Sequence, residues 1–128
     1  MDDKKKKFTL EYPINSTVAS LYSKLSTEEG LSSWFADRVE KNNNRFTFFW
    51  QKTPQEADLL AEKENKHIRF RWREEDIESY FEFVITPLEL TGDLTLSVTD
   101  FAEHDEYEDA QHMWNVNIKN LKRSLGAG

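Results

Sequence analysis

Three histidines are the side chains of this 128-residue chain best suited to a metal site or to acid–base catalysis. His104, Glu108 and His112 follow one another at intervals of four residues, which places neighbours on one face of a helix. That face turns by roughly 40° at each interval, because a helical turn takes about 3.6 residues, so the three could not hold one ion without strain. His67 opens an outward row of a predicted strand, where no cleft or partner for a general base is evident. We therefore expect no metal site and no catalytic histidine.

Three arginines recur at every second position of the same predicted strand and could clamp an anion. Guanidinium groups at Arg69, Arg71 and Arg73 suit carboxylate or phosphate. The hairpin that follows supplies carboxylates of its own. A register that pairs Arg73 with Glu78 also sets Arg69 opposite Glu82, Arg71 opposite Tyr80, Phe70 opposite Phe81 and Ile68 opposite Phe83. We therefore expect surface ion pairs and no anion site.

Nucleophilic and phosphate chemistry is not indicated by the sequence. The chain has no cysteine, which removes disulfides, thiolate catalysis and cysteine-ligated zinc, and no serine lies in a G-x-S-x-G motif. The four glycines are not spaced to wrap a phosphate group. Asp37 and Arg38 could orient a polar head group, but an ordinary turn is the simpler expectation. We expect no catalytic residue and no cofactor.

The formal net charge is −7, and it is unevenly distributed. Residues 74–109 hold 13 acidic side chains and no lysine or arginine, so this segment could steer a basic protein partner. An acidic balance argues against nucleic acid as a ligand. Apolar runs of only a few residues predict no stable membrane insertion and no signal segment. We expect a single cytoplasmic domain over residues 1–128, with a basic tail at residues 1–7.

Periodicity predicts the elements that must position these side chains. Alternating apolar residues at 8–12 predict a strand, and a helical face at 18–25 follows. The S-x-x-E sequence from Ser26 to Glu29 predicts a capping box that starts a second short helix. Further strands are predicted at 36–41, 46–50, 57–64, 67–73, from 78 onward and at 94–98, with breaks at 42–44, 53–54, 65–66 and 91–93.

A long helix is predicted to close the chain, over about residues 105–125. Its apolar side chains recur at intervals of three or four and form one stripe: Tyr107, Ala110, Trp114, Ile118, Leu121 and Leu125. A sheet with one apolar face needs a cover, and this helix is long enough to supply it. The fold class is therefore α+β, with about six to seven antiparallel strands curved around the final helix.

Three segments, in this order, resemble the START-like superfamily, and within it the branch of activators of the heat-shock chaperone ATPase, the Aha-type proteins. They are residues 25–35 with a Trp-Phe pair, residues 66–72 ending in Phe-Arg-Trp, and residues 114–125 reading W-x3-I-x2-L-x3-L. The chain departs from many members of that branch at residues 42–44, where they carry a Gly-rich turn, and at residues 112–114, where they carry Gly-Trp. The resemblance implies a helix-grip fold with a cavity between the sheet and the final helix for a lipid-like ligand.

Aromatic residues, 13 % of the chain, fit such a cavity. Ligand pockets are largely apolar and aromatic, although a filled core would use the same residues. Buried indole N–H groups at Trp34, Trp50 or Trp72 would need polar partners. The expected cavity walls are Leu31, Trp34, Phe35, Phe48, Trp50, Phe70, Trp72, Phe81, Phe83, Leu96, Met113 and Trp114.

Three functions follow from these features. The aromatic inner face favours non-enzymatic binding of a small hydrophobic, lipid-like ligand. The acidic segment and the resemblance favour, as an alternative, a protein-interaction module that regulates an ATPase in the manner of a co-chaperone. A cyclase or hydrolase is the third, and it requires a titratable group in the cavity, for which Tyr12, Tyr22 and Tyr107 are the candidates.

Overall fold

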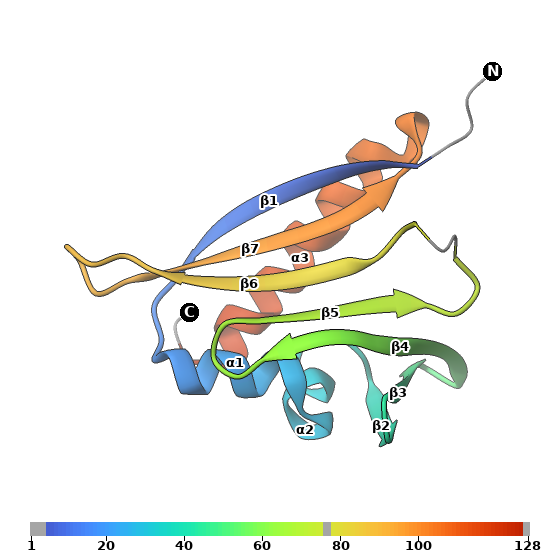
Figure 1. Ribbon diagram of the computed structural model, residues 1–128, viewed down its shortest axis with the longest axis horizontal. Helices are drawn as coiled ribbons and strands as arrows, with labels where there is room; N and C mark the ends of the chain where they lie inside the picture. Colours follow the sequence, from blue (N-terminus) through green and yellow to red (C-terminus); the bar gives the residue numbers. More distant parts are fainter. Residues whose placement is uncertain (1–4, 76–77, 127–128) are drawn as a thin grey trace.

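The computed structural model describes residues 5–75 and 78–126, and within them seven antiparallel strands form one sheet. The strand order is β1-β7-β6-β5-β4-β3-β2, as Figure 1 shows. Strands adjacent in sequence pair with each other from β2 to β7, and β1 pairs with β7. The strands are β1 (Lys6–Ile14), β2 (Arg38–Asn42), β3 (Arg45–Trp50), β4 (Thr53–Lys63), β5 (His67–Trp72), β6 (Phe81–Pro87) and β7 (Leu94–Ala102).

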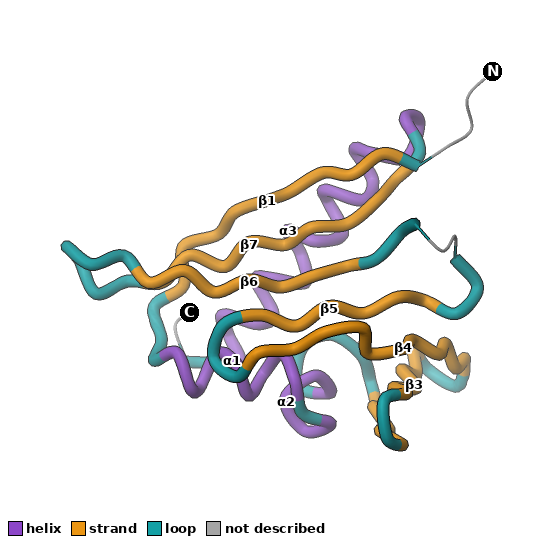
Figure 2. Tube along the Cα trace, in the orientation of Figure 1, coloured by secondary structure: helices purple, strands orange, loops and turns teal. Residues whose placement is uncertain are grey.

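Two short helices, α1 (Val18–Ser26) and α2 (Glu28–Ser32), connect β1 to β2, and the chain ends in the long helix α3 (Tyr107–Ser124). A 3-10 turn, η1 (His104–Glu106), leads into α3. The α3 helix lies across one face of the sheet, and the sheet bends so far that β2 and β3 are seen almost end-on (Figures 1 and 2). The predicted helix-grip fold is confirmed. In the part of the chain that is described, no helix has the length and apolar character needed to cross a membrane.

Fewer residues of α3 are buried against the sheet than the predicted apolar stripe contains. Trp114, Ile118 and Leu121 are buried, at spacings of four and three residues, so they share one face of the helix. Tyr107 is 38 % exposed, although its ring meets Phe8 of β1 edge-on at 5.1 Å. The first turns of α3 therefore lie at the margin of the sheet, and the helix is anchored from Trp114 onward.

Threonines begin both short helices. Thr17 caps α1 by accepting a hydrogen bond from the Ser20 amide at 3.1 Å, and Thr27 caps α2 through the Gly30 amide at 2.9 Å. The predicted capping box at Ser26 is wrong by one residue, because Ser26 is the last residue of α1 and donates to the Tyr22 carbonyl. An N-cap must leave helical geometry, and Thr27 does so with φ −110° and ψ 157°.

The hairpin of β5 and β6 has the predicted register, with Ile68 opposite Phe83, Arg69 opposite Glu82 and Phe70 opposite Phe81. The break expected at residues 53–54 is wrong, because β4 runs unbroken from Thr53 and pairs Pro54 with Phe49 of β3. A register shift between Leu59 and Ala61 interrupts the pairing of β4 with β5. Such bulges increase local bending of a strand, which fits the strong curvature of this part of the sheet.

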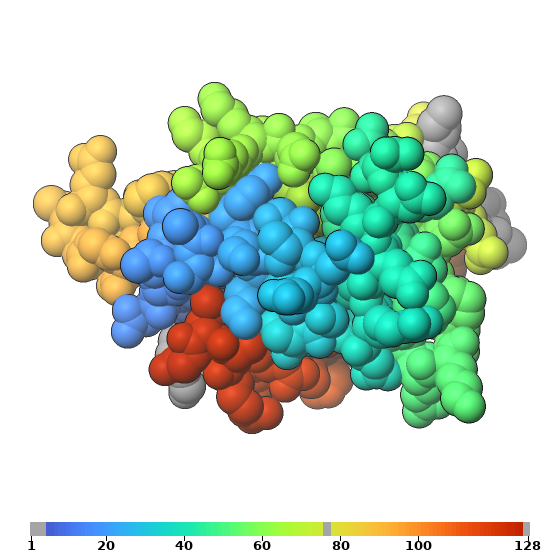
Figure 3. Space-filling model, turned by 90° about the horizontal axis from the view of Figure 1, so that it is seen from below, coloured from blue at the N-terminus to red at the C-terminus, as the bar shows by residue number. Residues whose placement is uncertain are grey.

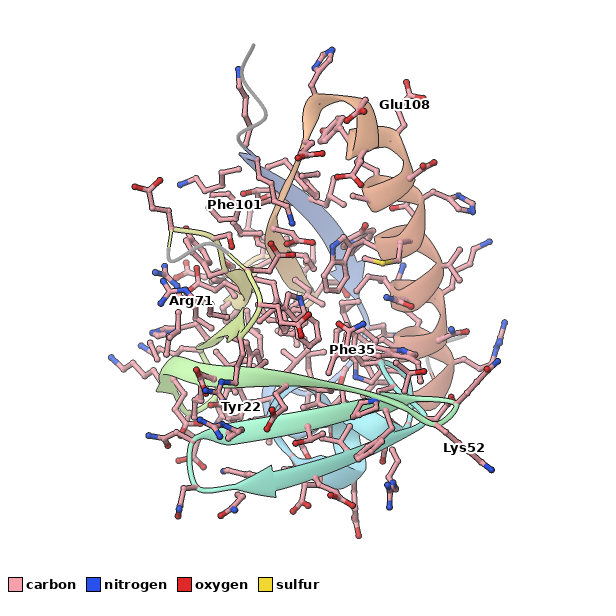
Figure 4. All side chains as sticks on the ribbon, turned by 90° about the vertical axis from the view of Figure 1, so that its right-hand side faces the viewer. Tyr22, Phe35, Lys52, Arg71, Phe101 and Glu108 are labelled. Atoms are coloured by element: carbon pink, nitrogen blue, oxygen red, sulfur yellow. The ribbon has the colours of Figure 1, made fainter. Side chains whose placement is uncertain are left out.

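One end of the space between sheet and helix is closed by α1. Figure 3 shows the end of α3 lying beside α1, while the hairpin of β6 and β7 projects to one side. Leu21 and Leu25 of α1 and Leu31 of α2 are fully buried there. The opposite end, near the loop between β5 and β6, is the view of Figure 4, and it contains the pocket described next.

Candidate ligand-binding site

A pocket of about 390 Å³ opens between α3 and the sheet, and we call it the α3 pocket. Its apolar wall comes from four parts of the chain: Phe35 after α2, Trp50 of β3, Trp72 of β5, and Met113 and Trp114 of α3. Figure 4 shows Phe35 in the interior beside α3. The polar part of the lining is Gln55, Glu74, Glu75, Asp100 and Asn117. The pocket thus joins an aromatic wall to a group of carboxylates.

The aromatic wall is organised around Phe35. The Phe35 ring is nearly parallel to the rings of Trp114 and Trp72. The centroid distances are 5.8 Å and 6.5 Å, and the interplanar angles are 16° and 15°. Trp50 meets the same ring edge-on at 5.5 Å. Contacts of this kind favour offset or edge-to-face geometry and hold the rings in fixed orientations.

Hydrogen bonds from three indole groups fix the rings further. Trp34 donates to the Lys24 carbonyl at 2.8 Å and Trp50 to the Phe35 carbonyl at 3.0 Å, as expected for buried indoles. Trp114 donates to a carboxylate oxygen of Asp100 at 2.9 Å. The last bond links α3 directly to β7, and both of its residues line the α3 pocket.

Asp100 is the site residue that the sequence analysis missed. The last strand was predicted to end at residue 98, yet Asp100 lies within β7, opposite Phe8 of β1. Leu94, Leu96 and Val98 are buried on one face of β7, and Asp100 continues that row because strand side chains alternate with a period of two. The signal was therefore present in the sequence.

The environment of Asp100 disfavours its charge. Burial is the main cause that raises the pKa of this carboxyl group, and Glu75 adds to it. The hydrogen bonds from Trp114 and from the Phe101 amide, and the charge of Lys5, act in the opposite direction. A carboxyl with these properties in a pocket can bind a cation or exchange a proton.

Lys5 supplies a cation at the edge of this carboxylate group. Its ammonium lies 2.6 Å from both oxygens of Glu75, and both side chains are about 70 % buried, with 28 % and 32 % exposed. The strand β1 begins at Lys6, two residues before the predicted start. The ion pair therefore ties the start of β1 to the loop after β5, beside the α3 pocket.

The twelve predicted wall residues fall into two groups. Phe35, Trp50, Trp72, Met113 and Trp114 line the α3 pocket. The other seven are buried behind that wall, in the packed core: Leu31, Trp34, Phe48, Phe70, Phe81, Phe83 and Leu96. Ring contacts such as Phe70 with Phe81 at 5.1 Å and Phe48 with Trp72 at 5.4 Å connect the groups. The core thus supports the pocket from behind.

A second hollow, the α2 groove, lies on the other side of Phe35 and Trp50. It measures about 590 Å³ and is bordered by Ser32–Asp37, Trp50, Asn117, Asn120, Arg123 and Ser124. Asp37, expected in a turn, accepts a hydrogen bond from the Gln51 amide at 2.5 Å, and Arg38 pairs with Glu40 at 3.1 Å. The lining of the α2 groove is mostly polar, unlike the wall of the α3 pocket.

The three arginines in and directly after β5 have partners within the protein. Arg69 pairs with Glu82 at 3.0 Å, as predicted, and Arg71 donates to the Ser79 carbonyl at 3.0 Å. Arg73 does not follow the prediction, because it turns to Glu56 at 3.8 Å and Asp58 at 4.0 Å on β4. For Arg73, the neighbouring strand β4 thus supplies the carboxylates that the hairpin was expected to supply.

Possible metal ligands were also considered at the start of α3. His104 lies in η1, whereas Glu108 and His112 lie on α3, and all three are exposed. Carboxylate oxygens of Glu103, Asp105 and Glu106 lie within 4.8 Å of one another on the same surface. Exposed acids of this kind are ordinary at the start of a helix, where they complement its dipole.

Comparisons with known proteins agree with this architecture. A family model described as a START-like superfamily domain matches residues 1–127. No curated protein matches the chain. The solution structure of BfR322 from Bacteroides fragilis is 40 % identical, with a TM-score of 0.70, over 94 % of this chain and 91 % of that one.

Two more distant structures share the fold. The Aha1 dimer from Colwellia psychrerythraea is 15 % identical, with a TM-score of 0.80, over 94 % of this chain and 96 % of that one. CalU16 from Micromonospora echinospora is 12 % identical, with a TM-score of 0.76, over 94 % of this chain and 76 % of that one. At these identities the likeness concerns the fold alone.

Proposed function

This chain belongs to the START-like superfamily, and from that premise we propose that it binds a small, largely apolar ligand in the α3 pocket. The superfamily fold commonly binds hydrophobic ligands between its sheet and its long helix. The observation that carries the proposal is the wall of Phe35, Trp50, Trp72 and Trp114 around a hollow of about 390 Å³. Small-molecule sites usually measure about 300–1,000 Å³ and combine apolar walls with a few polar groups.

Rigidity of the wall supports binding as well. Ring contacts and indole hydrogen bonds within the protein fix the positions of Phe35, Trp50 and Trp114. A preformed site loses less conformational entropy when a ligand enters, which favours affinity. Met113 is 46 % exposed at the mouth, and its flexible thioether side chain can adjust to ligands of different shape.

A substitution that fills the α3 pocket with a larger side chain tests the proposal. The probe is N-phenyl-1-naphthylamine, a neutral apolar dye whose fluorescence rises in apolar surroundings. We expect saturable binding to the protein and at least tenfold weaker binding to Met113→Trp, which fills the mouth. Val116→Trp is the matched control, because Val116 lies on the same helix, is 44 % exposed and does not line the α3 pocket.

Two results would contradict ligand binding in this pocket. The first is no saturable dye binding by the unmodified protein, which would transfer the assignment to the protein-interaction alternative. The second is an equal effect of Met113→Trp and Val116→Trp, which would place the dye elsewhere on the protein.

A further inference from the structure

We infer that the α3 pocket selects an organic cation, that is, an ammonium group carried on an apolar body. This inference rests on the proposed function and narrows its ligand class. It depends on two independent features of the same pocket: its lining contains a set of carboxylates and a set of aromatic rings.

The carboxylates outnumber the cations at the pocket. Glu74, Glu75 and Asp100 belong to its lining, and Lys5 pairs with Glu75 at 2.6 Å. Arg73, next to Glu74 in the chain, is directed to Glu56 and Asp58 of β4. Across residues 5–75 and 78–126, Glu74 has no ion-pair partner. One negative charge at Glu74 and one at Asp100 are therefore left to attract a ligand.

Asp100 is held in an orientation that suits a cation in the pocket. One carboxylate oxygen accepts the Trp114 indole N–H at 2.9 Å, and the other accepts the Phe101 amide at 2.7 Å. Each carboxylate oxygen can accept a second hydrogen bond, so two bonds leave capacity for a ligand. Burial makes this charge costly when the pocket holds no cation, and a cationic ligand would offset that cost.

The aromatic wall favours the same kind of ligand. Trp50 and Trp72 are half-buried at the pocket, with ring centroids 6.0 Å apart. Tryptophan faces attract cations more strongly than other rings do, and groups of such rings recognise quaternary ammonium ions. An anionic amphiphile such as a fatty acid would meet like charge at Glu74 and Asp100, so the pocket discriminates against it.

A series of three compounds with alkyl chains of similar length and different head groups tests this inference. Octyltrimethylammonium, octanol and octanoate each compete with bound N-phenyl-1-naphthylamine at pH 7, at concentrations at which each compound is dissolved as monomers. We expect octyltrimethylammonium to displace the dye at a concentration at least tenfold lower than octanoate. Asp100→Asn and Glu74→Gln should each reduce this ratio at least threefold.

The control is Glu89→Gln, which removes the same charge from an exposed position between β6 and β7, outside the pocket lining, and should leave the ratio unchanged. Glu74 is exposed, so Glu74→Gln remains a valid test if Asp100→Asn fails to fold. Equal displacement by all three compounds, or preference for octanoate, would overturn the cation inference and leave the proposed function intact. Failure of the dye to bind the unmodified protein would overturn both the cation inference and the proposed function.

Discussion

Asp100 places a carboxyl group beside the Trp114 indole, and burial raises its pKa. The folded protein therefore holds this proton more tightly than the unfolded chain, whose aspartates titrate near pH 4. The contribution of Asp100 to stability is thus fully present below that value and is lost as the pH rises through its folded pKa. The group is tolerated at neutral pH at a cost in stability, which is typical of groups kept for binding or chemistry.

This linkage predicts how Asp100→Asn changes stability with pH. Asparagine does not ionise, so the urea midpoint of the unmodified protein should rise relative to that of Asp100→Asn when the pH falls from 7 to 4. Asp93→Asn, at an exposed turn position, should follow the unmodified protein. Parallel pH profiles for the unmodified protein and Asp100→Asn would contradict the assigned pKa shift.

At the residue scale, the inward position of Asp100 could be predicted from the alternation along β7, although the predicted strand ended at Val98. Its hydrogen bond to Trp114 was not readable, because it depends on how α3 is rotated over the sheet. The need of Trp34 and Trp50 for indole partners was predicted, whereas the partners, two backbone carbonyls, follow from the path of the chain around α2.

At the element scale, the junction of α1 and α2 depends on the absence of a side chain at Gly30. A Cβ atom built at Gly30 would stand 2.7 Å from the Lys24 Cα and closer still to the Ser23 carbonyl oxygen. Gly30 is therefore required by the close approach of the two helices. This requirement could not be predicted from the sequence, since spacing along one helix does not reveal its distance from another.

Gly30→Ala separates this packing constraint from helix propensity. Propensity alone would stabilise the protein, because alanine is favoured over glycine in helices by roughly 1 kcal/mol. The clash should instead lower the free energy of unfolding by about 1–3 kcal/mol, measured by urea denaturation. Ser23→Ala, at an exposed position of α1, should stay within about 0.5 kcal/mol. A gain in stability for Gly30→Ala would refute the close packing.

Boundaries between elements were predicted less well than the elements themselves. Every predicted strand exists, and the register of β5 with β6 follows from matching charge and apolar bulk on opposite faces. The break at Pro54 was wrong because proline at this position is accommodated within β4, opposite Phe49. Local turn preference was overridden there by the pairing of two long strands.

At the scale of the whole molecule, α3 completes the core. Trp114, Ile118 and Leu121 cover the apolar face of the sheet, so a chain ending at residue 103 would expose that face to water. We expect this truncated chain to lose cooperative unfolding in urea, followed by circular dichroism. A chain ending at residue 124 retains α3 and should unfold cooperatively. A soluble, cooperative fragment without α3 would contradict the role of the helix.

The aromatic residues show what a sequence can and cannot specify at this scale. Their inward orientation was predictable from alternation, and so was their placement between sheet and helix. Their division into a packed core around Phe70, Phe81 and Phe83 and a pocket wall around Trp50 and Trp72 was not. That division depends on the curvature of the sheet and the position of α3, which set where rings meet and where space remains.

The most direct test of ligand binding in the α3 pocket is a proton–nitrogen correlation spectrum of the four indole groups during titration with N-phenyl-1-naphthylamine. Trp72 and Trp114 line the α3 pocket, whereas Trp34 borders the α2 groove. The account predicts saturable shifts for the Trp72 and Trp114 signals and an unchanged Trp34 signal. A shift of Trp34 alone, or no shift of any indole, would contradict it.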